Sequence, residues 1–286
     1  MIERVGVIGA GTMGAGIAQV CALAGMDVIL CDISPAALER GIQGISASLR
    51  REVDKGRLDA AVAENAQGRI VGGDNQALAQ VGLVIESATE LLSLKRQILS
   101  DVERLVGPSA ILATNTSSIS ITRLASAVSR PEGFIGLHFF NPAPAMALVE
   151  VIAGLQTSGA TLATATDFVR SVGKRPIVVS DSPGFVVNRL VCPMINEAIV
   201  ALQEGVTTAE DIDAALTLGC HHPVGPLALA DLIGLDVLLA IMDTFFDSFK
   251  DSKYRAAPLL RLMVNAGRLG RKSGRGFYNY ARSATT

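Results

Sequence analysis

The sequence has no long apolar run, no excess of charge of one sign, and few cysteines or histidines. Charged or strongly polar residues interrupt every apolar stretch well before the ~20 residues that a membrane span needs. The 25 basic and 27 acidic residues leave a formal charge of −2, which gives no electrostatic reason to expect binding to nucleic acid or a membrane surface. An anionic ligand would therefore need a local cluster of basic side chains.

Cysteine usage argues against both disulfides and a metal site. Cys21, Cys31, Cys192 and Cys220 lie in apolar or helix-like stretches without a C-x-x-C pair, so we expect buried free thiols. Internal repeats and low-complexity tracts are also missing. The first residues lead directly into a strand pattern, which leaves no room for a signal peptide, and we expect a cytoplasmic protein. The mean hydropathy of +0.40 is high and suggests a large core or a subunit interface.

A glycine-rich turn follows the first predicted strand, residues 4–8. Residues 9–14 read G-A-G-T-M-G and open an Ala-rich helical stretch. In this G-x-G-x-x-G pattern the glycines permit a tight turn, close approach of a pyrophosphate and close helix–strand packing, and the helix N-terminus offers N–H groups to phosphates. A second strand, residues 27–31, ends at Asp32, about 20 residues on, where a carboxylate binds ribose hydroxyls and repels a 2′-phosphate. The pattern predicts an NAD site.

Ser34-Pro35 begins a predicted helix that runs into the 50s. Its later part carries Ser48, Lys55 and several arginines. Such a basic face is most often solvated, and the residues alone favour that interpretation. Beside a cofactor site it could also bind the phosphates of a bulky anionic substrate.

Further apolar runs predict parallel strands at residues 69–71, 83–87 and 110–114. Glu90 and Lys95 follow one of these strands, and T-N-T-S-S at 114–118 ends another. Ligands of a doubly wound sheet bind at such strand ends, although ordinary loop and cap chemistry is the alternative.

His138 lies near the end of an apolar strand pattern, residues 134–140. A histidine in such a strand is more often a satisfied core residue than a base. Glu150 changes that balance, because it also lies in an apolar run, 148–152, where an unpaired carboxylate would be costly. On adjacent strands the two would form a general base with an orienting partner. The other histidines, His221 and His222, read as loop residues.

The pattern becomes helical beyond the turn at residues 181–184, after a last strand at 175–180. We therefore expect an α/β fold: a Rossmann-like, doubly wound and mostly parallel sheet in residues 1–182, followed by an all-helical domain in residues 183–286. The helical domain is rich in Leu, Ile and Ala, which suits a dimer interface.

Motifs along nearly the whole chain resemble the L-3-hydroxyacyl-CoA dehydrogenase family, and within it the bacterial 3-hydroxybutyryl-CoA dehydrogenases. They are G-A-G-T-M-G, V-I-E-S-A-T-E-x-x-x-x-K, T-N-T-S-S, H-F-F-N-P, L-V-E-V-I, P-G-F-V-V-N-R, P-V-G-P-L-A-L-A-D-L-I-G-L-D and K-S-G-R-G-F-Y. The pair Leu91-Leu92 departs from the commoner Asn-Leu without affecting an implied role.

The resemblance implies reversible hydride transfer between NAD and C3 of an (S)-3-hydroxyacyl-CoA, with His138 as general base and Glu150 as its partner. Ser117, Asn141 and Asn188 would be the polar residues around the reacting group, with Ser117 and Asn188 also binding substrate. Coenzyme A would contact Ser48 and Lys55, which reverses the first interpretation of that helix face. The implied cofactor residues are Gly9, Ala10, Gly11, Thr12, Met13, Gly14, Asp32, Glu90, Lys95, Asn115 and Lys272.

Two other functions stay open at this point. One is a dehydrogenase of a sugar acid or another hydroxy acid that lacks coenzyme A. The other is a structural or regulatory NAD-binding protein without activity.

Overall fold

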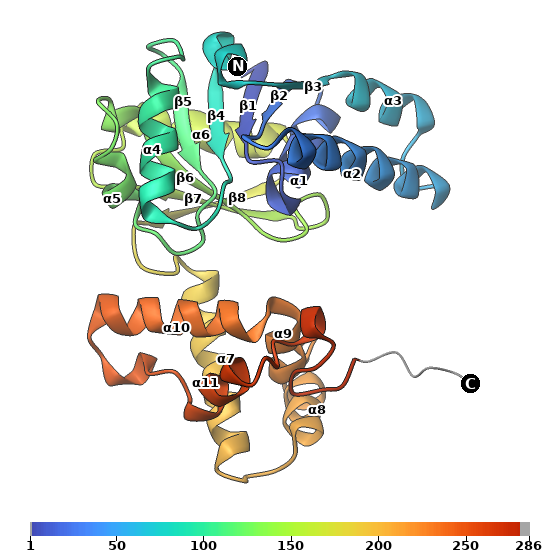
Figure 1. Cartoon of the computed structure of the whole chain (residues 1–286), viewed down its shortest axis with the longest axis vertical. Coiled ribbons are helices and arrows are strands. Elements are labelled where there is room, and N and C mark those ends of the chain that lie inside the picture. The colour runs from blue at the N-terminus through green and yellow to red at the C-terminus, as the bar shows by residue number, and fades with distance from the viewer. Residues whose placement is uncertain (1, 281–286) are drawn as a thin grey trace. The chain divides into compact units, whose positions relative to one another are not determined.

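The computed structural model describes residues 2–280 of the chain, which divide after Phe185 into two compact units. The sequence predicted the division at 182/183. Figure 1 shows the first unit from blue to yellow-green and the second from yellow to red.

An eight-stranded sheet forms the centre of the first unit, in the order β3-β2-β1-β4-β5-β6-β7-β8 (Figure 1). Its first six strands run parallel, whereas β7 pairs antiparallel with β6 and β8 pairs parallel with β7. The strands are β1 (Arg4–Ile8), β2 (Asp27–Cys31), β3 (Ile70–Gly73), β4 (Leu83–Glu86), β5 (Ile111–Thr114), β6 (Phe134–Phe139), β7 (Leu148–Ala153) and β8 (Arg175–Ser180). The predicted mostly parallel sheet is confirmed.

Helices cover both faces of this sheet, as a doubly wound fold requires. The helices are α1 (Thr12–Leu23), α2 (Pro35–Asp54), α3 (Ala60–Gly68), α4 (Leu92–Glu103), α5 (Ile121–Ala125) and α6 (Gly159–Ser171). One apolar core joins the sheet to α1, α2, α3 and α6, and a second core joins the opposite face to α4 and α5. The buried strands are apolar on both faces for this reason.

Local sequence explains where several of these helices begin. The hydroxyl of Ser34 accepts a hydrogen bond from the backbone N–H of Ala37, and Pro35 occupies the first turn of α2. Asp59 caps α3 and Ser158 caps α6 in the same way. The prediction of a long helix beginning after Ser34 is confirmed.

The second unit is helical. It consists of α7 (Val187–Gln203), α8 (Ala209–Cys220), α9 (Pro226–Ile233), α10 (Leu235–Phe249) and α11 (Pro258–Asn265). The sequence pattern predicted a single helical run after Pro226, but Gly234, with φ of +103°, separates α9 from α10. Left-handed backbone of this kind cannot continue a helix.

None of the helices in residues 2–280, the described part of the chain, is both long enough and apolar enough to cross a membrane. No group of three or more His, Cys, Asp or Glu side chains among these residues is arranged to hold a metal ion. The four cysteines are free thiols, but the expectation that all are buried is wrong for Cys220, which is exposed at the end of α8.

Candidate active site at the carboxyl edge of the sheet

The glycine loop joins β1 to α1, and its three glycines have different surroundings. Gly9 has a φ of +98°, and a Cβ there would lie 2.6 Å from the carbonyl oxygen of Ser87. A Cβ on Gly14 would lie 1.7 Å from the carbonyl oxygen of Gly9. Gly11 differs, because no atom lies within 4 Å of the position that its Cβ would take. This open side and the uncapped N-terminus of α1, which begins after Gly11, leave room and N–H donors for a phosphate.

Asp32 is fixed between this loop and α2. Its Oδ2 accepts a hydrogen bond from the backbone N–H of Ala10 (2.8 Å), and its Oδ1 accepts one from the N–H of Ser34 (2.9 Å). Each carboxylate oxygen keeps a lone pair for a further donor. The carboxylate is therefore oriented beside the phosphate-binding loop, where the ribose of a dinucleotide would lie.

Polar residues after β4 and β5 meet at the same edge. Glu90 Oε1 accepts hydrogen bonds from the backbone N–H groups of Ser117 (3.0 Å) and Ser118 (3.2 Å). Asn115 Oδ1 accepts a hydrogen bond from the backbone N–H of Phe139, 2.8 Å away, which ties this loop to the end of β6. Because parallel strands end together, these side chains share an edge with the glycine loop.

His138 and Glu150 face each other across β6 and β7. They are directly opposite in the antiparallel register, and His138 Nδ1 lies 2.7 Å from Glu150 Oε2. Glu150 has no solvent exposure and His138 has 6%. The rings of Phe140 and Phe185 lie 4.5 Å and 5.6 Å from the imidazole, between ring centroids. The expectation that the two residues lie on neighbouring strands within hydrogen-bonding distance is confirmed.

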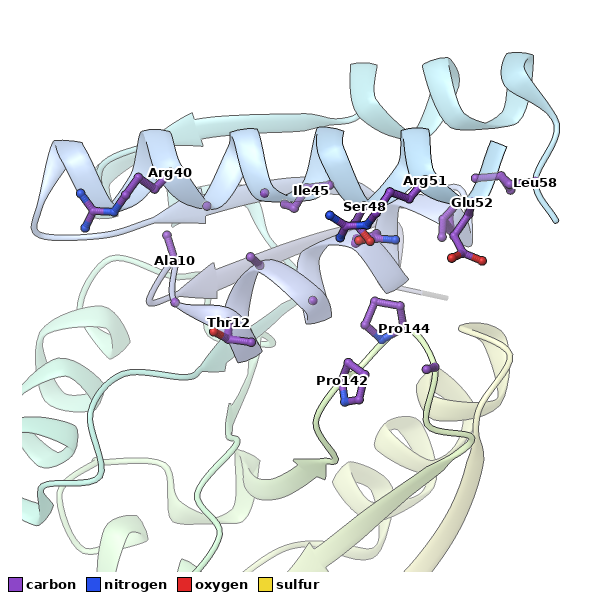
Figure 2. Close-up of a pocket in the computed structure, with 18 of the residues that line it drawn as sticks. Ala10, Thr12, Arg40, Ile45, Ser48, Arg51, Glu52, Leu58, Pro142 and Pro144 are labelled. Atoms are coloured by element: carbon purple, nitrogen blue, oxygen red, sulfur yellow. The ribbon is translucent and has the colours of Figure 1, made fainter. Parts of the chain in front are cut away.

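A cavity of about 890 Å³ opens between α1, α2 and the segment 142–145, which follows His138 in the chain. Figure 2 shows Ser48, Arg51 and Glu52 on α2, opposite Pro142 and Pro144. The charged residues that line this cavity are Arg40, Arg51, Arg57 and Glu52, and their formal charges sum to 3 − 1 = +2. This is the local basic cluster that an anionic ligand needs in a chain of net charge −2.

Ser48 and Lys55 were both predicted to bind coenzyme A, but they differ in their position relative to this cavity. Ser48 lines the cavity, whereas Lys55 lies outside the lining and forms an exposed ion pair with Glu52, with Nζ–Oε1 at 3.5 Å. Arg51, which belongs to the same basic face, lines the cavity instead.

Asn188 and Lys272 belong to the second unit. Asn188 is in the first turn of α7. Lys272 lies in a short 3₁₀ turn, Arg271–Ser273, and its Nζ donates to Asp236 Oδ2 at 2.7 Å. Asn141 precedes a cis peptide bond to Pro142 and is exposed in the first unit.

The sheet edge thus brings together most of the predicted site residues of the first unit. These are the glycine loop, Asp32, Glu90, Lys95, Asn115, Ser117, His138 and Glu150. The sequence interpretation assigned no role to Glu86, the last residue of β4, whose buried carboxylate binds Lys95. An acidic residue at the end of an apolar strand was the signal that could have identified it.

Comparison with known proteins is consistent with this geometry. Residues 4–182 match the 3-hydroxyacyl-CoA dehydrogenase NAD-binding domain, and residues 184–280 match the C-terminal domain of the same family. The chain belongs to the 3-hydroxyacyl-CoA dehydrogenase family. Its first unit is therefore the NAD-binding domain of that family, in agreement with the glycine loop and Asp32.

Three relatives within the 3-hydroxyacyl-CoA dehydrogenase family show how far the likeness extends. A 3-hydroxybutyryl-CoA dehydrogenase of Bradyrhizobium diazoefficiens is 52% identical, over 98% of this chain and 96% of the relative. One from Clostridioides difficile is 46% identical, over 97% and 99%. The crystal structure of (S)-3-hydroxybutyryl-CoA dehydrogenase from Ralstonia eutropha is 52% identical and has a TM-score of 0.96, over 99% of this chain and all of that one.

Proposed function

We propose that this chain interconverts short-chain (S)-3-hydroxyacyl-CoA, such as 3-hydroxybutyryl-CoA, and 3-ketoacyl-CoA with NAD. The observation that carries the proposal is the His138–Glu150 pair, 2.7 Å between Nδ1 and Oε2, at the sheet edge that also holds the glycine loop. The relatives named 3-hydroxybutyryl-CoA dehydrogenase support the short acyl chain.

His138 is the general base of the proposed reaction. With Nδ1 directed at Glu150, the opposite ring nitrogen, Nε2, takes the proton of the substrate 3-hydroxyl. The buried carboxylate of Glu150 stabilises the imidazolium formed and fixes the orientation of the ring. NAD, when bound, accepts the hydride from C3. In the reverse direction the imidazolium returns the proton to the 3-keto oxygen.

The cofactor residues fit NAD rather than NADP. Asp32 is held beside the glycine loop by the N–H groups of Ala10 and Ser34, and its charge would repel a 2′-phosphate. We assign Glu90, Lys95, Asn115 and Lys272 to the nicotinamide side of the cofactor site.

The cavity beside α2 is the proposed site of the coenzyme A group. Its volume of about 890 Å³ falls within the range of ligand pockets, and Ser48 with the arginines of α2 offers hydrogen-bond donors to phosphates. Lys55 would need to leave Glu52 to take part. Ser117, Asn141 and Asn188 are assigned to the acyl group and the reacting oxygen.

We also propose a homodimer formed through the helical second unit, in the cytoplasm, without nucleic-acid or membrane partners. Exposed apolar side chains on that unit support an interface, among them Leu190 at 67%, Leu218 at 80% and Leu262 at 65% exposed. Sedimentation at several protein concentrations tests the assembly.

A chain-length series of 3-ketoacyl-CoA substrates, assayed with NADH and with NADPH, tests the function. We expect NADH oxidation with acetoacetyl-CoA and a falling kcat/KM as the chain lengthens. Activity on a small free hydroxy acid or sugar acid but not on acyl-CoA would favour the alternative dehydrogenase. NADH binding without turnover of either class would favour a structural NAD-binding protein.

A further inference from the structure

A buried charge cluster lies behind the candidate cofactor site, at the carboxyl end of β4. Glu86 has no solvent exposure and Lys95 has 1%. Lys95 Nζ lies 2.9 Å from Glu86 Oε1 and 3.0 Å from Oε2, and it donates to the carbonyl oxygen of Ala88 at 3.1 Å. Glu90 Oε2 is 3.3 Å from the same nitrogen.

These contacts occupy the hydrogen-bonding capacity of Lys95. An ammonium group has three N–H donors, and four oxygen atoms already surround this one within 3.3 Å. A lysine so enclosed is held in one position beside the candidate cofactor site. It acts on the site through the groups that it holds, chiefly Glu90.

Two hydrogen-bonded connections join Glu86 to the loop after β5. Through Lys95 it fixes Glu90, which accepts hydrogen bonds from the N–H groups of Ser117 and Ser118. Directly, its Oε2 accepts a hydrogen bond from the Thr114 hydroxyl at 2.7 Å, and the same hydroxyl oxygen accepts the N–H of Thr116 at 3.3 Å.

The same loop is tied to the end of β6. Asn115 Oδ1 binds the N–H of Phe139, the neighbour of His138. The loop therefore connects the buried cluster both to Ser117 and to the strand that carries the proposed base.

We propose that Glu86 is a positioning residue for hydride transfer. It acts through Lys95, Glu90 and Thr114 to fix the loop that carries Asn115 and Ser117. The inference rests on the proposed dehydrogenase function. A wild-type enzyme that fails to oxidise NADH with acetoacetyl-CoA would refute that function, whereas the inference is tested by the ratio of variant to wild type.

Glu86→Gln keeps the shape of the side chain and removes its charge. We expect kcat for acetoacetyl-CoA reduction to fall at least ~10-fold, because a misplacement of about 1 Å can cost about 100-fold in rate. The Kd of NADH should change less than ~3-fold, because its phosphates and adenine ribose are assigned to the glycine loop and Asp32 and not to the groups that Glu86 holds. The isotope effect on kcat with NADH deuterated at the transferred position should rise, as hydride transfer becomes rate-limiting.

A role confined to stability gives a different result. Asp213→Asn is the matched control, since Asp213 is a buried carboxylate of the second unit that binds the N–H groups of Leu227 and Ala228. We expect this variant to lose thermal stability with little change in kcat. If Glu86→Gln keeps kcat within ~2-fold of wild type, or loses it only in proportion to its folded fraction, the inference is overturned.

Thr114→Val is the milder variant if Glu86→Gln does not fold. It removes one hydrogen bond to Glu86 and leaves the Lys95 contacts in place. We expect a smaller fall in kcat, again with a larger isotope effect. An unchanged kcat and isotope effect in a folded Thr114→Val protein would overturn the inference.

Discussion

His138 and Glu150 occupy directly opposed positions of an antiparallel strand pair, and His138 Nδ1 lies 2.7 Å from Glu150 Oε2. Opposed side chains of such a pair have their Cβ atoms about 5 Å apart, which suits one hydrogen bond between an imidazole and a carboxylate. Both groups are buried among apolar neighbours, where each compensates the cost of burying the other. The pairing depends on β7 reversing direction after β6.

The position of Asp32 predicts a preference for NADH. We expect the wild-type kcat/KM for NADH to exceed that for NADPH by at least ~10-fold, because the carboxylate binds ribose hydroxyls and repels a 2′-phosphate. Asp32→Ala should lower the ratio of kcat/KM for NADH to kcat/KM for NADPH. Asp27 is an exposed carboxylate at the start of β2, the strand that Asp32 follows, and the control Asp27→Asn should leave this ratio unchanged. Equal kcat/KM values for NADH and NADPH in the wild type would contradict the assignment of Asp32 to the ribose.

Arg51 is expected to bind a phosphate of coenzyme A. Loss of a charge-assisted hydrogen bond of roughly 1.5 kcal/mol in Arg51→Gln should raise the KM for acetoacetyl-CoA about tenfold and leave kcat nearly unchanged. Lys55→Gln should have a smaller effect, since Lys55 lies outside the cavity lining. Arg104→Gln, at an exposed position directly after α4, serves as the control. Equal effects of Arg51→Gln and Arg104→Gln would refute the cavity as the coenzyme A site.

The sequence was sufficient to predict those parts of the site that depend on local pattern. The turn at Gly9, the acid at Asp32 and the capped helix after Ser34 each follow from a few neighbouring residues. The direction of β7 and the opposed register of His138 and Glu150 depend on tertiary pairing, which an apolar run does not specify.

Side-chain partners were harder to predict from the same pattern. Lys55 and Arg51 lie on one basic helix face, and only the packing of α2 against α1 distinguishes the residue that lines the cavity. Glu86 reads as the end of a strand until its contacts with Lys95 and Thr114 are known.

Burial of the cysteines predicts that a single thiol reacts in the native protein. Burial raises the pKa of Cys21 and of Cys192 to about 12, and that of Cys31 to about 11. Their thiolate fraction near neutral pH is therefore very small, whereas Cys220 is exposed. Ellman's reagent should label one thiol quickly in the folded protein and four after unfolding. Cys220→Ser should abolish the fast phase, and two or more fast thiols would contradict this prediction.

The lowered pKa of Glu90 predicts that the protein loses stability in acid. Burial tends to raise its pKa, but the charge of Lys95 and hydrogen bonds from Thr116 and Ser117 outweigh that effect and hold the pKa below its usual value of 4.5. The contribution of the Glu90 carboxylate to the free energy of unfolding is therefore fully present at a pH above its usual pKa of 4.5. It is lost as the pH falls through the lower pKa of the folded state. Glu90→Gln should reduce the Tm at neutral pH, and the Tm of this variant should fall less steeply than that of the wild type between about pH 5 and pH 3. An equally steep fall of the Tm in both proteins would contradict a stabilising role of the Glu90 charge.

The most direct test of the whole account is the single-turnover rate of acetoacetyl-CoA reduction by His138→Gln, with the Kd of NADH measured on the same protein. General acid–base catalysis contributes about 10²- to 10⁴-fold, so we predict a fall of at least ~100-fold in that rate and an unchanged Kd. A folded His138→Gln protein that turns over at near wild-type rate would contradict the assignment of His138 and Glu150 as the catalytic pair.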